Sequence, residues 1–98
     1  MKKIKLVMEK PFPTNVDISI IDVTEGKEKR RGGLTAEYAR IDLKPILDRG
    51  GSLEDALKEY EDWIDRTLRR HLLDECEIVE GKDELIRIIR DRIEKYFR

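Results

Sequence analysis

The sequence has little of what metal-binding, catalytic and secreted proteins depend on. It contains one cysteine and one histidine in 98 residues, and aromatic residues make up 6%. The lone Cys76 cannot form an intramolecular disulfide, which favours a reducing, cytoplasmic location. The lone His71 has no second histidine with which to hold a metal, and no nucleophile motif is recognisable. We therefore expect no metal site, no cofactor and no enzymatic activity.

A long hydrophobic run and a net charge are also missing. No stretch approaches the ~18 consecutive apolar residues of a membrane-spanning helix, and the charged N-terminal residues do not resemble a signal peptide. The formal net charge is −1, so no global basic field attracts nucleic acid. We expect no membrane contact, and any nucleic-acid site must be a local basic patch.

Charged residues are abundant instead. They make up 44% of the chain, against ~25% in an ordinary protein. Many of them fall into acid-first i,i+4 pairs, a pattern typical of hyperthermophile proteins, whether archaeal or viral. These pairs are Glu54 with Lys58, Asp62 with Arg66, Asp65 with Arg69, Asp83 with Arg87, Asp91 with Lys95 and Glu94 with Arg98. The hydrophobic residues occur in periodic runs, so the length and composition predict one folded domain over residues 1–98.

Residues 1–43 form the β-rich part of this domain. Apolar and polar side chains alternate there, which is the period of a half-buried strand. The alternation predicts strands over residues 3–9, 15–24 and 34–43, with a charged loop at residues 26–33. In the third strand the alternation changes phase near residues 39–40, which predicts a β-bulge.

Residues 44–98 form the helical part. Proline at position 45 favours a short helical turn, and Ser52 is typical of the N-cap of a long amphipathic helix ending near residue 73. An acidic connector, either a brief strand or an extended segment, leads to a final helix that Asp83 is expected to cap. The predicted fold class is α+β: a three- to four-stranded antiparallel sheet, then the long helix and the C-terminal helix packed on one sheet face.

The charged loop carries the sharpest local feature. Lys27, Lys29, Arg30 and Arg31 place four bases within five residues, between glycines. Such a group can contact a phosphate backbone, or it can simply keep an exposed hairpin tip in solution. Lys5, on the polar face of the first strand, would add to the basic surface if it lies on the same side.

Aromatic residues near the sheet suggest base stacking as a second contact. Tyr38 and Arg40 are two residues apart on the third predicted strand and share a face, as stacking on a base and contact with a phosphate require. Phe12, between two prolines, is a further stacking candidate. The alternative places Tyr38 in the core beneath the long helix and Phe12 as a plug over the core.

The C-terminal helix has an apolar stripe wider than one packing surface needs. Ile86, Ile89, Ile93 and Tyr96 form a seam at three- and four-residue spacing. We expect one side of the helix to cover the sheet and this seam to contact a second subunit, which predicts a homo-oligomer.

Part of the sequence resembles a known family. Residues 33–42 (GLTAEYARID), 51–57 (GSLEDAL) and 63–65 (WID) place a sheet strand before a glycine and a charged amphipathic helix. This pattern, within residues 1–73, is similar to small phage and archaeal proteins. It resembles the single-stranded-DNA-binding proteins of hyperthermophilic archaea that lack the usual OB-fold protein. The resemblance implies an antiparallel sheet with packed helices, oligomerisation through the C-terminal helix and binding of single-stranded DNA.

Two functions follow from these features. In the first, the protein binds single-stranded nucleic acid, with Lys27, Lys29, Arg30, Arg31, Arg40 and Lys5 on phosphates and with Tyr38 and Phe12 on bases. In the second, it is a non-enzymatic self-assembly or protein-interaction module that uses the C-terminal helix. The two differ in electrostatic geometry, because the first requires the bases to converge on one surface.

Overall fold

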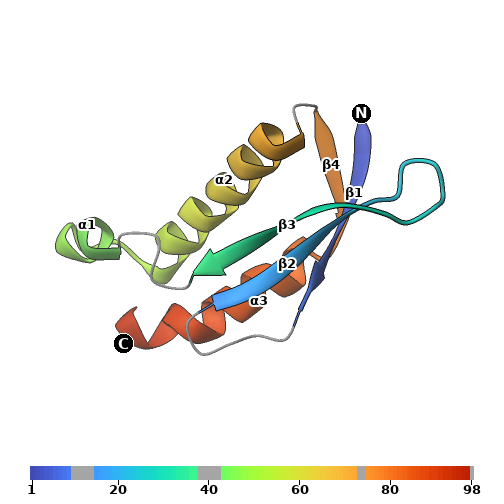
Figure 1. The fold of residues 1–98 in the computed structure, drawn as a ribbon. Helices are drawn as coiled ribbons and strands as arrows, with labels where there is room; N and C mark the ends of the chain where they lie inside the picture. The colour runs from blue at the N-terminus through green and yellow to red at the C-terminus, as the bar shows by residue number, and fades with distance from the viewer. Residues whose placement is uncertain (10–14, 38–42, 73–74, 98) are drawn as a thin grey trace.

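The computed structural model describes residues 1–9, 15–37, 43–72 and 75–97 (Figure 1). In chain order it forms β1 (Lys2–Met8), β2 (Asn15–Asp22), β3 (Lys29–Glu37), α1 (Leu43–Asp48), α2 (Leu53–Leu72), β4 (Cys76–Glu80), α3 (Lys82–Ile93) and a 3₁₀ turn, η1 (Glu94–Phe97). A sheet followed by a long helix and a C-terminal helix confirms the predicted α+β fold class.

The sheet is mixed, with strand order β3-β2-β1-β4. The first three strands form an antiparallel meander, in which Leu6 pairs with Ile20 and Ile18 with Leu34. The acidic connector of the sequence forms β4, which pairs in parallel with β1. The parallel pairing differs from the antiparallel sheet expected, and it arises because α2 crosses over the sheet and returns the chain to the end where β1 begins.

Strand β3 begins earlier than the sequence predicts. The expected loop over residues 26–33 contains the first five residues of the strand, with Lys29 opposite Asp22 and Arg30 opposite Ile21. Arg31 is an extra residue in the ladder, because the register shifts between Ile20 and Ile21. This β-bulge lies among charged residues, where periodicity carries no signal. The bulge predicted near residues 39–40 lies outside the described residues.

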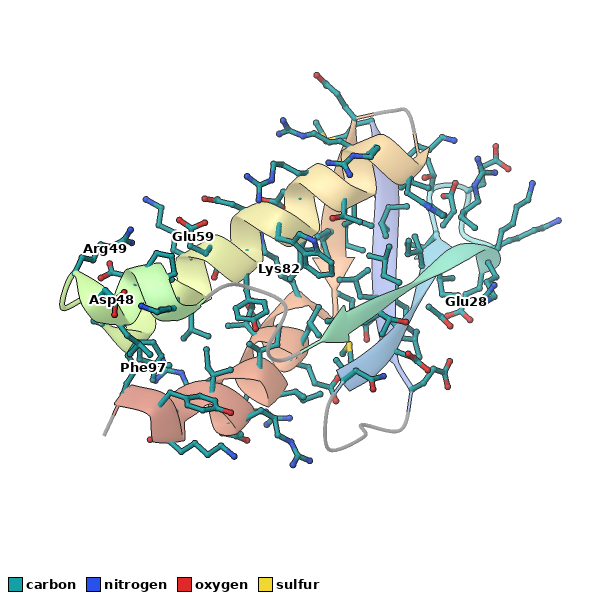
Figure 2. The ribbon with its side chains drawn as sticks, turned by 60° about the vertical axis from the view of Figure 1, so that its left-hand side comes forward. Glu28, Asp48, Arg49, Glu59, Lys82 and Phe97 are labelled. Carbon is teal, nitrogen blue, oxygen red and sulfur yellow. The ribbon has the colours of Figure 1, made fainter. Side chains whose placement is uncertain are left out.

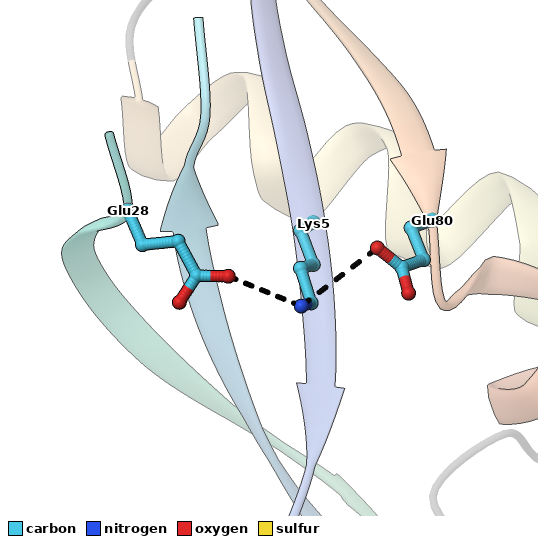
Figure 3. A network of polar contacts seen from close by, with 3 residues as sticks. All are labelled: Lys5, Glu28 and Glu80. Carbon is cyan, nitrogen blue, oxygen red and sulfur yellow. Dashed lines mark hydrogen bonds and ion pairs between the residues drawn. The ribbon is translucent and has the colours of Figure 1, made fainter. Parts of the chain in front are cut away.

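The core lies between one face of the sheet and the two long helices. Ile4 on β1 and Val16 and Ile20 on β2 are fully buried at even-numbered intervals, as the alternation predicts. Tyr60 and Ile64 of α2 and Leu85, Ile89 and Ile93 of α3 meet them from the helix side. Trp63 is half-buried against this core. The other sheet face carries Lys5, Asp17 and Thr35 and is not covered by α2 or α3 (Figure 3).

The predicted subunit contact of the C-terminal helix is wrong in its central residues. Ile89 and Ile93 are 0% exposed within a single chain and belong to its own core. Ile86 is half-buried against that core, and Tyr96, which is 50% exposed, is the one member of the seam on the surface. These residues are buried because α3 packs against both α2 and β4 of the same chain.

The start of α3 also differs from expectation. Gly81 is the N-cap, with a left-handed φ of 96°, and Asp83 lies inside the first turn. The Gly81 carbonyl accepts a hydrogen bond from the Leu85 N–H at 3.0 Å. A side chain at residue 81 would collide with the backbone of Leu6, so this turn requires glycine for both its φ and its space.

Ion pairs join the helices to one another. Asp65 of α2 pairs with Lys82 of α3 at 3.4 Å, and Glu54 of α2 pairs with Arg90 of α3. The predicted i,i+4 pairs that fall wholly within the described ranges do not reach ion-pair distance, and Arg98 of the remaining pair lies outside them. An i,i+4 pair forms instead between Lys44 and Asp48 of α1, at 2.7 Å. Two acids of α2 thus form ion pairs with α3. The bases in the last turns of α2 take no part in these two ion pairs.

The hairpin between β2 and β3 lies at one end of the long axis and α1 lies at the other. Figure 2 shows this separation, with Glu28 at the hairpin end and Asp48 and Arg49 at the opposite end. Of the helices within the described ranges, none is both long and apolar enough to cross a membrane.

Candidate nucleic-acid interface

Charged side chains surround an open hollow of about 410 Å³ at the hairpin end of the sheet. Its basic members are Lys2, Lys27, Lys29 and Arg31, and its acidic members are Asp22, Glu25 and Glu28. Thr24 completes the wall. The structure therefore brings together three of the bases predicted from the hairpin.

Strand geometry sets which face of the sheet each base occupies. Asp22 is two residues from the buried Ile20, so both point to the helix side, and Lys29 lies opposite Asp22. Arg31 lines the same hollow because the bulge displaces it from simple alternation. Arg30 lies opposite Ile21 and turns to the uncovered face of the sheet. The predicted cluster of four bases is thus divided between two surfaces.

The absence of a side chain at Gly33 makes room for Arg30. A Cβ at residue 33 would lie 3.0 Å from the Arg30 Nη2 atom, so the guanidinium extends along β3 over this glycine. A second hollow on the uncovered face contains Arg30 together with Glu9, Asp17, Ser19 and Thr35. Carboxylates accompany Arg30 there, which makes that surface less favourable for phosphate.

Lys5 lies on the uncovered face as expected, but it is engaged by two carboxylates (Figure 3). Its Nζ atom is 3.2 Å from Glu28 Oε1 and 3.8 Å from Glu80 Oε2. The hydrogen bond to Glu28 and the charges of Glu28 and Glu80 raise the pKa of the Lys5 amine. Lys5 therefore adds no net positive charge to the surface, and it balances the charge of Glu28.

Asp22 is the second acid whose charge is satisfied within the protein. Its Oδ1 atom accepts hydrogen bonds from the Thr24 hydroxyl at 2.6 Å and the Thr24 N–H at 2.9 Å. These bonds, helped by the charges of Lys2 and Arg31, hold the pKa of Asp22 below its ordinary value. Lys2 and Arg31 line the same hollow as Asp22.

The end of α2 contacts β3 next to one residue of the hollow, since Gly32 directly follows Arg31. The His71 ring lies directly against Gly32, on the space a side chain would fill. Gly32 pairs with Ile20, two residues or about 7 Å along β2 from Asp22. Arg69, Arg70 and His71 are the basic residues of the last turn of α2, and all three are exposed.

Other predicted site residues are not placed by the structure. Tyr38, Arg40 and Phe12 lie outside the described residues, so stacking by either ring remains a prediction. Lys2 was not predicted from the sequence. Its position beside the hairpin could have been predicted, because an antiparallel meander brings the start of the first strand beside the end of the second.

Neither metal chemistry nor kinship gives a further indication of function. Within the described ranges, no three histidine, cysteine, aspartate or glutamate side chains are grouped as metal ligands. Comparisons with protein-family models, with curated proteins and with solved structures find no match to this chain. The charge geometry of the hairpin end is therefore the feature that bears on function.

Proposed function

We propose that this protein binds single-stranded nucleic acid through its phosphates, at the hairpin hollow. One observation carries the proposal. Among the described residues, no carboxylate lies at ion-pair distance from Lys27, Lys29 or Arg31, whereas Glu28 is paired with Lys5. Bases without a close partner retain the charge that neutralises phosphate and releases counterions.

The size and position of the basic surface favour a single strand over a duplex. The molecule measures 44 × 25 × 17 Å, and the hairpin occupies one end of its long axis. A duplex needs an element that enters a groove or a long basic track along its backbone. A short single strand can bend to fit a small basic surface, and single-strand-binding OB folds cover ~4–16 nucleotides.

Arg31 and Arg30 give a matched test of the proposal, because they are adjacent in sequence and lie on opposite sheet faces. We expect Arg31→Ala to weaken the binding of labelled single-stranded oligonucleotides, and to do so equally for every oligonucleotide sequence, because phosphate contacts carry no sequence information. The slope of log K against log salt should fall by ~0.7, since one phosphate is no longer neutralised. Arg30→Ala should leave the slope close to that of the wild type. Fluorescence anisotropy across a salt series measures both.

Two results would count against the proposal. Failure of the wild-type protein to bind DNA or RNA oligonucleotides at low salt would remove it. Equal losses of affinity in Arg30→Ala and Arg31→Ala would show that net charge, and not the hollow, determines binding. Both variants should melt like the wild type by circular dichroism, since both side chains are exposed.

A further inference from the structure

We infer that the bases near the end of α2 form the second half of the nucleic-acid site, so that a bound strand passes from the hairpin hollow over His71 to Arg70 and Arg66. The inference rests on the proposed function and extends it to a part of the chain more than thirty residues away in sequence. These three residues are called the α2 cluster.

Contact between His71 and Gly32 brings the end of α2 beside the residue that follows Arg31. Gly32 follows Arg31 directly, and its lack of a side chain allows the His71 ring to lie on β3. A side chain at position 32 would collide with the His71 ring, which would have to turn away from β3. The bulge at Arg31 keeps its side chain on the wall of the hollow, one residue from the contact with His71.

Helical spacing places Arg66 and Arg70 together. They are four residues apart, so they lie on one face, one turn above the other. Both are exposed, and neither has a carboxylate at ion-pair distance among the residues that the structure describes. The sequence suggested Asp62 as the partner of Arg66, but Asp62 stays beyond that distance.

Cations at a helix C-terminus are favourable to the helix, but that role does not require the hairpin beside them. Arg70 suits the dipole of α2 wherever its side chain points. The dipole leaves unexplained why a second group of bases, on β3, borders the same helix end. A phosphate backbone satisfies both groups at once, because successive phosphates contact successive bases.

A double variant tests the α2 cluster. In Arg66→Ala/Arg70→Ala, the salt slope for a labelled oligonucleotide should fall by about 1.4, for two phosphates at ~0.7 each. The matched control is Lys58→Ala/Arg87→Ala. It removes the same charge from exposed helix positions, and Lys58 is about 18 Å along α2 from Arg70. We expect the control to bind with the wild-type slope.

The outcomes separate this inference from the proposed function. If Lys29→Ala/Arg31→Ala lowers the slope but Arg66→Ala/Arg70→Ala does not, the α2 cluster lies outside the site and the proposed function stands. If the control lowers the slope as much as Arg66→Ala/Arg70→Ala, general charge accounts for the effect and the inference is overturned. Absence of binding by the wild-type protein removes both proposals.

Discussion

At the scale of one residue, Asp22 shows how hydrogen bonds in the hairpin determine the protonation of a side chain in the hollow. In the folded protein the pKa of Asp22 lies below its ordinary value of 3.8, because Thr24 donates two hydrogen bonds to the carboxylate. A lowered folded-state pKa adds stability that is fully present above the unfolded-state value. This stability disappears as the pH falls below 3.8 and through the folded-state pKa.

Removal of the Thr24 hydroxyl should reduce that shift. We expect Thr24→Val to move the Asp22 carboxyl titration, followed by NMR, upward toward 3.8 without reaching it, because the Thr24 N–H bond remains. Thr35→Val serves as the control, since the Thr35 hydroxyl donates to Asp17 on the uncovered face. An unchanged titration in Thr24→Val would show that the hydroxyl does not hold Asp22.

Single-residue roles were the part of the site least accessible from the sequence. Lys5 was correctly placed on the polar face of its strand, but its partners come from elsewhere in the chain. Glu28 reaches Lys5 across 23 positions of sequence, and Glu80 reaches it from β4. Local periodicity contains no information on which distant carboxylate a lysine meets.

At the scale of elements, the wide apolar stripe of α3 is compatible with two arrangements: burial inside the chain, or contact with a second subunit. Ile89 is fully buried inside the chain, so Ile89→Ala should lower the free energy of unfolding by ~2–5 kcal/mol. Tyr96 is half exposed, and Tyr96→Ala should change it by only ~0.5 kcal/mol. Urea denaturation measures both. A cost below ~1 kcal/mol for Ile89→Ala would contradict the position of α3 in the core.

Elements with a strong period were predictable, and those determined by tertiary contacts were not. The stripe of α2 and the alternation of β1 and β2 depend on burial on one side, which the sequence records directly. β4 is at most half-buried, and its strand character depends on pairing with β1. The start of β3 is a run of charges whose pairing with β2 overrides the loop-like composition.

At the scale of the whole molecule, burial of Ile89 and Ile93 within the chain weakens the reason for expecting an oligomer built on the seam of α3. The exposed large hydrophobic residues of the described chain are few, namely Met1, Leu47, Val79 and Tyr96. We expect the protein to be a monomer by light scattering at about 100 µM, a concentration at which micromolar association is visible. A dimer mass would show that another surface mediates association.

The convergence of two basic groups also belongs to this scale. The hairpin bases and the α2 cluster lie in the sequence as separate charge runs, each with a plausible local role. His71 lies against Gly32 because the chain crosses over the sheet within α2 and ends the helix there. Local charge runs in the sequence do not show that the end of α2 lies beside β3, because that contact depends on the topology.

The elongated shape of the molecule affects how several copies would be arranged on one strand. A protein that binds a strand near its hairpin end would hold α1 at the far end of its 44 Å long axis, away from that strand. Proteins packed side by side along a strand, at the short end of the ~4–16 nucleotide range, would form a continuous coat on that strand. Every α1 would then project outward, and Leu47, which is 39% exposed, would be repeated at regular intervals along the outer rim of that coat.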